Sequence, residues 1–281
     1  MEDYSIWIVS PQGYLHSRCY EEVALGLHHG FAELGINAPV IRERAEIVGR
    51  PVILGAILLP MLGHVDIPSH AVIFNLEQID HSVPWMTSGY WDLLARHEVW
   101  DYSETNLEKL RRLGITQAKL CEIGYVPALT RTPSAVQDID VLMYGSFNDR
   151  RLQVVREIRD RGINIECLFG IYGEERDAFI DRAKIILNVH FYEARVFEIV
   201  RVSYLLANRK FIVSETGVDQ GIEHRYSDGI VFVAYDRLCD ACERYLKDDS
   251  ERQRIASLGF DRFSQYPQAA FLRQVLDMYA K

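Results

Sequence analysis

The residues best suited to chemistry in this sequence lie close together between positions 188 and 198. His190, Glu193, Arg195 and Glu198 follow Ile185–Val189, an apolar run with the length of a buried strand. A guanidinium binds phosphate oxygens through paired N–H groups, and a carboxylate accepts hydrogen bonds from sugar hydroxyls. These residue types at one strand–helix junction therefore predict a site for a ligand that carries both phosphate and sugar.

The chain after this strand has apolar residues at helical spacing. The spacing predicts a helix that begins near Ala194, with Arg195 in its first turn and Glu198 three residues later on the same face. A cation in the first turn opposes the helix dipole, so a negatively charged ligand is expected nearby. The alternative is a surface ion pair between Arg195 and Glu198, with His190 as an ordinary core histidine.

A second phosphate contact is expected after the predicted strand at residues 139–144. Gly145 and Ser146 follow that strand, and Arg150 lies at the start of the next helix. Glycine permits close backbone approach, a helix N-terminus offers free N–H groups, and arginine adds fork-shaped donors. The alternative is an ordinary capped turn with solvated arginines.

An aromatic loop follows the next predicted strand, at residues 163–169. Aromatic residues and glycines lie close together there, and they can form a surface on which a nucleobase stacks. The candidate nucleobase contacts are Phe169, Gly170 and Tyr172. The alternative is a simple loop with one buried aromatic ring.

Three candidates for a catalytic base lie in the first half of the chain. His16 ends the segment after the first predicted strand, and Glu77 and Asp80 follow the strand at residues 71–74. Each is a residue type that can remove a proton from a hydroxyl or bind that hydroxyl. An exposed loop histidine is the alternative for His16.

Strand and helix signals alternate along the whole chain, and this alternation predicts an α/β fold. A segment rich in Pro and Thr at residues 126–137 separates two such passages. We therefore expect two Rossmann-like, doubly wound domains facing a cleft, at residues 1–128 and 138–265, and a helix at 266–281 that packs back on the first domain. Ligands of such sheets bind beyond the carboxyl ends of the strands.

Composition limits the classes of function. The 281 residues carry a net charge of −9, which argues against sequence-independent nucleic-acid binding. The longest apolar run is shorter than a membrane span, and the acidic N-terminal residues do not resemble a secretory signal, so a cytoplasmic protein is expected. Five scattered cysteines predict no disulfide framework. Cys239 and Cys242 are expected on a helix face, and Asp138-Ile139-Asp140 at the start of a strand, so no metal site is predicted.

The segment Asn188 … Arg195-Val196-Phe197-Glu198 … Ser214-Glu215 resembles the donor site of the GT-B-type glycosyltransferases. It is most similar to the glycosyl transferases group 1 and the spore-maturation-protein-like branch, whose members often read Arg-x-Phe-Glu. The resemblance covers most of residues 139–220. It implies that Glu198 holds the ribose of a nucleotide sugar and that Arg195 lies near its diphosphate, with Asn188 and Phe197 in the same stretch. His190 stands where many relatives carry an acid.

The residues and the resemblance together predict a metal-independent transferase. It would move a hexose-type sugar from a UDP- or GDP-linked donor to an acceptor hydroxyl, without a further cofactor. Arg195 would neutralise the leaving diphosphate, and His190 or Glu193 would meet the sugar. A nucleotide-sugar 2-epimerase of the same layout and a non-catalytic bilobal small-molecule-binding protein are the alternatives.

Overall fold

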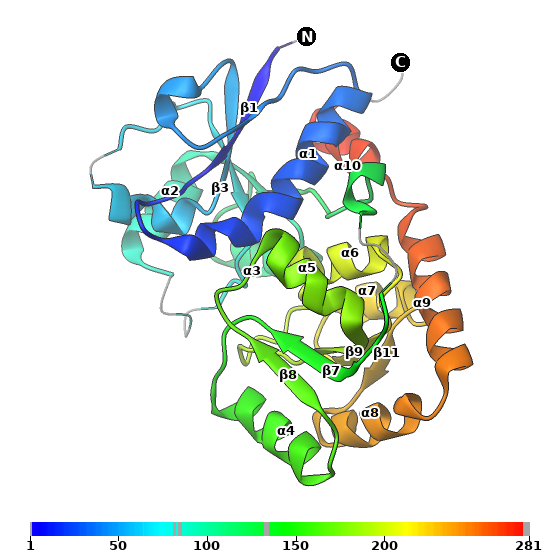
Figure 1. Ribbon diagram of the computed structural model, residues 1–281. Coiled ribbons are helices and arrows are strands. Elements are labelled where there is room, and N and C mark those ends of the chain that lie inside the picture. The colour runs from blue at the N-terminus through cyan, green and yellow to red at the C-terminus, as the bar shows by residue number, and fades with distance from the viewer. Residues whose placement is uncertain (1, 64, 81–82, 84–85, 132–134, 278–281) are drawn as a thin grey trace. The chain divides into compact units, whose positions relative to one another are not determined.

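The computed structural model describes residues 2–63, 65–80, 83, 86–131 and 135–277, and it divides into two compact units (Figure 1). Unit 1 comprises Met1–Leu129 and Tyr266–Lys281, and unit 2 comprises Thr130–Gln265. Each unit is built on one sheet in which all strand pairs are parallel. The predicted α/β class with two doubly wound sheets is confirmed.

Unit 1 contains a six-stranded sheet in the order β2-β1-β3-β4-β5-β6. Its strands are β1 (Tyr4–Ile8), β2 (Val40–Ile41), β3 (Arg50–Leu54), β4 (Val72–Asn75), β5 (Glu98–Asp101) and β6 (Lys119–Leu120). Its α-helices are α1 (Glu21–Glu33), α2 (Ser88–Arg96), α3 (Glu104–Arg112) and α10 (Gln268–Val275), joined by the 3₁₀ segments η1 (Leu15–Tyr20), η2 (Arg44–Glu46), η3 (Ala56–Leu62) and η4 (Pro127–Leu129).

Strand β3 ends earlier than its apolar sequence predicts. The run Val52–Leu59 predicts a strand throughout, but the chain turns at Gly55, which has a φ of 73°. A Cβ at this position would lie 2.5 Å from Cε2 of Tyr20, so only glycine fits both the left-handed backbone and the packing. The rest of the apolar run forms η3 beyond the sheet edge.

Helix α10 completes unit 1 from the far end of the sequence. It lies beside α1 in Figure 1, and a Cβ on Gly30 of α1 would lie 2.9 Å from both Gln268 and Leu272. The Gln268 side chain accepts a hydrogen bond from the Gly124 amide at 2.7 Å. Residues 266–277 thus belong structurally to the same unit as residues 2–129.

Unit 2 contains a five-stranded sheet in the order β11-β10-β9-β7-β8. Its strands are β7 (Ile139–Tyr144), β8 (Ile165–Leu168), β9 (Ala183–Asn188), β10 (Ile212–Glu215) and β11 (Val231–Val233). Its helices are α4 (Asp149–Asp160), α5 (Gly173–Arg182), α6 (Ile199–Ala207), α7 (Gln220–Arg225), α8 (Leu238–Leu246) and α9 (Asp249–Phe263), with a 3₁₀ turn η5 (Tyr235–Arg237).

One apolar core joins the sheet of unit 2 to helices α4 and α8. Val154 and Ile158 of α4 and Cys242 of α8 pack there with strand residues such as Val141 and Ile185. Cys239 is buried in the same core, so both members of the Cys-x-x-Cys pair face the interior of the unit. Burial of alternate residues on both strand faces explains the nearly continuous apolar strand sequences.

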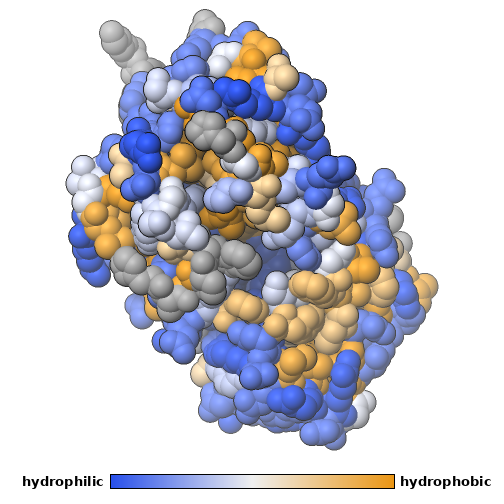
Figure 2. Space-filling view, turned by 90° about the vertical axis from the view of Figure 1, so that its left-hand side faces the viewer, coloured by the Kyte–Doolittle hydropathy of each residue, from blue (hydrophilic) through white to orange (hydrophobic). Residues whose placement is uncertain are grey.

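The surface is mixed in character. On the face shown in Figure 2, groups of hydrophobic side chains are interspersed among hydrophilic ones. Over the described residues as a whole, the large exposed apolar side chains include Leu15, Met61 and Phe169. Among the described residues, no helix has the length and apolar character that a membrane crossing requires.

Candidate functional site

The candidate site lies at the carboxyl edge of the sheet in unit 2. Strand β7 has β8 on one side and β9 on the other. The chain therefore passes from β7 to β8 in one direction and then crosses back to β9 in the opposite direction, which makes the edge beside β7 a topological switch point. Such a switch point leaves a crevice at the strand ends where ligands of parallel sheets bind. The loops after β7 and β9 bring Asn188, His190 and Glu198 together with Arg151 and Arg201 there.

Glu198 is the most densely contacted acidic group at this edge. It caps the N-terminus of α6, and its carboxylate accepts a hydrogen bond from Nδ2 of Asn188 at 3.1 Å. Nδ1 of His190 lies 3.1 Å from Oε1 and 3.0 Å from Oε2 of the same carboxylate. Because His190 and Asn188 are fully buried, these contacts hold the carboxylate in one position while its side chain stays 15% exposed.

The charge of Glu198 is stabilised despite its burial. Burial alone would raise the pKa of this carboxyl, but the hydrogen bond and charge of His190 and the charges of Arg201 and Arg151 outweigh it and lower the pKa to about 2. Glu198 is therefore an anion at neutral pH, and part of its side chain remains exposed. Such a group can accept hydrogen bonds from two neighbouring hydroxyls.

Two arginines beside Glu198 are held mainly by neutral oxygens. Arg151 donates to the carbonyl oxygens of Val189, at 2.9 Å, and Ser146, at 2.7 Å. Arg201 donates to the carbonyl oxygen of Tyr144 at 2.8 Å and to the side-chain oxygen of Asn188.

The positive charge of this arginine pair is only partly balanced. Arg151 reaches Glu198 at 4.0 Å, and burial together with the charge of Arg201 lowers the pKa of Arg151 to about 9. The pair can therefore attract an anion to the switch point.

The prediction that Arg195 lies in the first turn of a helix is wrong. Helix α6 begins at Ile199, and Arg195 sits in the preceding loop with a φ of 44°. Asp219 accepts a hydrogen bond from the Phe197 amide at 2.8 Å, and the Arg195 carbonyl accepts one from Val218 at 3.0 Å. These bonds to the loop after β10 hold the segment in a non-helical conformation, so Arg195 and Glu198 do not share a helix face.

The Arg195 side chain is exposed. It forms no ion pair within the described part of the chain, so it remains available to an anion.

The loop after β10 packs tightly against His190. A Cβ on Gly217 would lie 2.2 Å from the Arg195 carbonyl oxygen and 2.8 Å from Nε2 of His190. Nε2 is buried and has no hydrogen-bond partner among the described residues. Gly217 is thus required by the close approach of the loops after β9 and β10.

The three phosphate contacts predicted after β7 have different surroundings in the structure. Gly145 has a φ of 113°, and a Cβ there would lie 3.1 Å from Nη1 of Arg201, so the glycine makes room for that arginine. Ser146 is exposed. Arg150 forms a two-pronged ion pair with Glu215 and lies over the Tyr235 ring at 4.1 Å, so it helps to join α4 to the end of β10.

The remaining predicted ligand contacts divide into exposed and buried groups. Phe169 is 59% exposed in the loop after β8, where Gly170 has a φ of 72° and Tyr172 precedes α5. Glu193 is exposed, whereas Phe197 is fully buried with its ring 5.4 Å from that of Phe232. Phe197 therefore supports the loop from the interior of the unit.

Arg201 was not identified from the sequence, and Glu215 was named there only as part of the donor-site resemblance, without a role. Arg201 follows Glu198 by three residues, in the first turn of an otherwise apolar helix. A cation in that turn was the signal that could have revealed it. Glu215 ends β10, and only the pairing of β10 with β9 brings it to Arg150 and to the His190 amide, at 3.1 Å.

The candidate bases of unit 1 lie at the carboxyl edge of its own sheet. Glu77 follows β4 and accepts a hydrogen bond from the Tyr20 hydroxyl at 3.1 Å. His16 lies in η1 with its ring 5.3 Å from that of Tyr14. Asp80 lies three residues beyond Glu77 and is half-buried.

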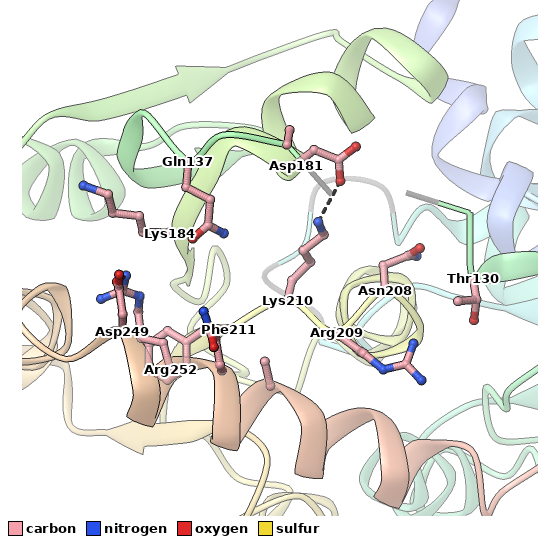
Figure 3. A pocket seen from close by; sticks show the side chains of 13 residues that line it. Thr130, Gln137, Asp181, Lys184, Asn208, Arg209, Lys210, Phe211, Asp249 and Arg252 are labelled. Carbon is pink, nitrogen blue, oxygen red and sulfur yellow. Dashed lines mark hydrogen bonds and ion pairs between the residues drawn. The ribbon is translucent and has the colours of Figure 1, made fainter. Parts of the chain in front are cut away.

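A separate cavity of about 620 Å³ lies at the opposite, amino edge of the sheet in unit 2 (Figure 3). Lys184, Lys210 and Arg252 line it together with Asp181 and other polar residues. Lys210 pairs with Asp181 at 2.7 Å, and the basic side chains point in different directions in Figure 3. The cavity therefore lacks the converging donors found at the carboxyl edge.

Within the described residues, no group of three or more His, Cys, Asp or Glu side chains is arranged to hold a metal ion. Asp138 pairs with Arg182 at 2.6 Å and Asp140 with Lys184 at 2.7 Å, so the Asp-x-Asp sequence forms ion pairs at the start of β7.

The relatives found by sequence comparison and described below are uncharacterized proteins. No protein-family model matches the chain. One uncharacterized protein of Acanthamoeba polyphaga mimivirus is 28% identical over 114 residues, which are 40% of this chain and 13% of the viral protein. A second uncharacterized protein of that virus is 23% identical over 229 residues, covering 70% of this chain and 72% of its own length. The chain thus spans only a small part of the first of these relatives.

Solved glycosyltransferase structures resemble nearly the whole chain. AviGT4, a glycosyltransferase involved in avilamycin A biosynthesis, has a TM-score of 0.59 at 11% identity, covering 99% of this chain and 97% of its own. Anabaena HepE in complex with UDP-glucose has a TM-score of 0.61 at 9% identity, covering 99% of both chains. T4 phage BGT in complex with its UDP-glucose substrate has a TM-score of 0.56 at 12% identity, covering 98% and 97%.

A fourth structure, TarM, has a TM-score of 0.55 at 10% identity; the match covers 83% of this chain but only 55% of TarM. These sequence identities are too low for the roles of individual residues to be transferred to this chain. The near-complete coverage by AviGT4, HepE and BGT nevertheless defines its architecture. The chain has the fold of the GT-B glycosyltransferases.

Proposed function

We propose that this protein transfers a sugar from a nucleotide-sugar donor to an acceptor hydroxyl. The observation that carries the proposal is the ionised Glu198 carboxylate beside Arg151 and Arg201 at the switch point of unit 2. A carboxylate for sugar hydroxyls and guanidinium groups for phosphate, side by side, match the two chemical parts of a nucleotide sugar.

In this proposal unit 2 binds the donor. Glu198 accepts hydrogen bonds from the ribose hydroxyls, and Arg201, Arg151 and the exposed Arg195 neutralise the diphosphate as it leaves. The exposed ring of Phe169 and the Tyr172 side chain offer surfaces for the nucleobase, and the exposed Glu193 is available to the sugar. The buried His190 acts in this proposal through its contact with Glu198.

The leaving group needs no metal ion in this scheme, because guanidinium groups supply the positive charge. We place the acceptor and its base, drawn from His16, Glu77 or Asp80, on unit 1. UDP-hexoses are the first donors to test, because HepE and BGT were solved with UDP-glucose.

A thermal-shift series with UDP-, GDP-, ADP-, CMP- and dTDP-sugars tests donor binding. A bound donor stabilises the protein by about 2.7 kcal/mol at 100 times its Kd. Release of free nucleotide from the donor, measured with and without EDTA, then reports turnover and metal dependence. Binding without turnover by any donor would indicate a sensor, and interconversion of two free nucleotide sugars would indicate an epimerase.

Substitution of the arginine cluster tests the location of the site. Arg201→Gln removes one charged contact to the diphosphate, worth roughly 1.5–3 kcal/mol, so we expect the Kd for UDP to rise by about 10-fold or more. Arg209→Gln is the matched control, because Arg209 is an exposed arginine lining the cavity at the amino edge of the same unit. Equal effects of the two substitutions would contradict the proposed site.

A further inference from the structure

The guanidinium of Arg201 lies over the ring of Tyr144, the last residue of β7. Cζ of Arg201 is 5.5 Å from the centre of that ring. Nη1 of the same guanidinium donates a hydrogen bond to the Tyr144 carbonyl oxygen at 2.8 Å. Arg201 is thus held by Tyr144 in two ways, through the main chain and through the face of the aromatic ring.

Two other arginines at this edge of the sheet also lie over aromatic rings. Cζ of Arg151 is 5.3 Å from the centre of the Phe191 ring, and Cζ of Arg150 is 4.1 Å from that of Tyr235. A ring face attracts a guanidinium without neutralising its charge, whereas a carboxylate neutralises it, as Glu215 does for Arg150. A ring can therefore hold an arginine in place and leave its charge available to an anion.

Arg201 keeps N–H groups that a ligand can use. Among the described residues, its side chain donates hydrogen bonds only to the Tyr144 carbonyl and to the Asn188 side chain, and it forms no ion pair. A guanidinium carries more N–H donors than two acceptors engage. The direction of the remaining donors depends on how Tyr144 and Asn188 orient the group.

A buried ion pair that the proposed function does not use lies against the same ring. Arg176 of α5 is buried, and its Cζ is 5.8 Å from the centre of the Tyr144 ring and 4.7 Å from that of Tyr204. Asp177 accepts hydrogen bonds from Arg176 at 2.7 Å and from the Tyr204 hydroxyl at 2.6 Å. Because Asp177 neutralises Arg176 inside the unit, Arg176 is not a phosphate contact.

This ion pair fixes the geometry around Arg201. A buried ion pair contributes little net stability, because desolvation of the two charges offsets their attraction. Its contacts here extend to two rings, and one of them, Tyr144, carries Arg201. The other, Tyr204, follows Arg201 by three residues and lies on the same face of α6. The pair therefore links α5 to α6 and to the end of β7.

We infer that Tyr144 is a positioning residue for the donor diphosphate; this inference rests on the proposed transferase function. The ring and the carbonyl of Tyr144 hold Arg201 so that the unused N–H groups of the guanidinium face the phosphate oxygens. Arg176 fixes the Tyr144 ring from α5. The ring supplies the contact to Arg201, so phenylalanine can replace tyrosine at this position.

The test compares the binding of UDP with that of uridine by titration calorimetry, because only UDP carries the phosphates that Arg201 would contact. We expect Tyr144→Leu to raise the Kd for UDP by about 5–10-fold, since a desolvated cation–π contact is lost. The Kd for uridine should stay within about twofold of the wild-type value. Tyr144→Phe keeps the ring and should bind both compounds as the wild type does. GDP and guanosine replace this pair if the thermal-shift series selects a GDP-sugar.

Tyr245→Leu is the matched control, because it also removes a ring from beneath an arginine. Cζ of Arg244 is 5.1 Å from the centre of the Tyr245 ring, which packs beside Phe211 at the amino edge of the sheet. This variant should leave both Kd values unchanged. In a protein that already carries Arg201→Gln, Tyr144→Leu should cause no further loss of UDP affinity, because no guanidinium remains to be positioned.

Two results would overturn the inference and leave the transferase proposal intact. One is wild-type UDP affinity in Tyr144→Leu beside a loss in Arg201→Gln, and the other is an equal loss from Tyr144→Leu with and without Arg201→Gln. If Tyr144→Leu does not fold, Arg176→Met decides, because Asp177 keeps its bond from Tyr204. Arg176→Met should raise the Kd for UDP by about 2–5-fold and spare uridine, and unchanged UDP affinity would overturn the inference. A wild-type protein that binds none of the five nucleotide sugars would instead overturn the transferase proposal, and this inference with it.

Discussion

At the scale of single residues, the carboxyl edge of unit 2 is organised around one charge. Glu198 is partly enclosed, yet His190, Arg201 and Arg151 keep it ionised. The identity of this residue could be predicted from the sequence, because a glutamate that follows a buried strand, His190 and Arg195 within a few residues is a local pattern. Asn188 and His190 were expected in the same site, and both contact Glu198. The contact with Arg151 could not be predicted, because Arg151 reaches Glu198 from α4 only through the pairing of β7 with β9.

The depressed pKa of Glu198 predicts a pH dependence of stability. Because its pKa is near 2 in the folded protein and near 4.5 in the unfolded chain, ionised Glu198 stabilises the fold at pH values above about 4.5. That contribution, on the order of 3 kcal/mol, is lost as the pH falls from about 4.5 toward 2. Urea unfolding at pH 6 and pH 3 should therefore show a difference between wild type and Glu198→Gln that shrinks at the lower pH.

Glu174→Gln provides the comparison, since Glu174 is an exposed residue in the first turn of α5. The effect of Glu198→Gln at pH 6 should exceed that of the control. A difference between wild type and Glu198→Gln that stays constant from pH 6 to pH 3 would mean that the charge of Glu198 does not stabilise the folded protein.

At the scale of elements, the order of strands and helices followed from the sequence, and the loop before α6 did not. Alternating apolar runs with Gly stops located most strands within a few residues. Val196 and Phe197 have helical spacing with the residues of α6, but hydrogen bonds from Phe197 to Asp219 and from Val218 to Arg195 hold this segment outside the helix. The local pattern was therefore overridden by contacts across about 20 residues of sequence, which no periodicity records.

Glycine substitutions test this loop contact. Gly217→Ala places a methyl group 2.2 Å from the Arg195 carbonyl oxygen, so the two loops must separate. We expect a loss of about 1–3 kcal/mol in unfolding free energy, together with weaker UDP binding.

Gly221→Ala is the matched control, four residues away in α7, where a Cβ meets nothing within 4 Å. Alanine there should be neutral or stabilise α7 by up to about 1 kcal/mol. Chemical unfolding and UDP titration of both variants measure the contrast. Equal stability of the two variants would show that the loops after β9 and β10 are not in close contact.

At the scale of the whole molecule, the two units differ in how the chain builds them. Unit 2 is one continuous segment, Thr130–Gln265, whereas unit 1 needs both ends of the chain. In unit 1, α10 buries Ala269, Phe271 and Leu272 and supplies Gln268 to the Gly124 amide. A segment that buries several apolar side chains is required for the stability of the unit that contains it.

We therefore predict different behaviour for separate pieces. A protein of residues 130–265 should fold cooperatively by itself, as measured by circular dichroism during urea unfolding. A protein of residues 1–129 should remain largely unfolded unless a peptide of residues 266–281 is added. Gln268→Ala in the full chain should lower the stability of unit 1 by about 1–3 kcal/mol, because the Gly124 amide loses its partner. Cooperative unfolding of residues 1–129 alone would contradict this dependence.

The position of α10 in the sequence also determines the order in which the two units can complete folding during synthesis. The strands of unit 1 are synthesised before unit 2, yet helix α10, which packs against α1, is synthesised after every residue of unit 2. Until α10 has been synthesised, the face of α1 that packs against it stays exposed in the nascent chain. Unit 1 is thus begun before unit 2 and completed after it, and in that interval α1 is a target for chaperones that recognise apolar helix faces.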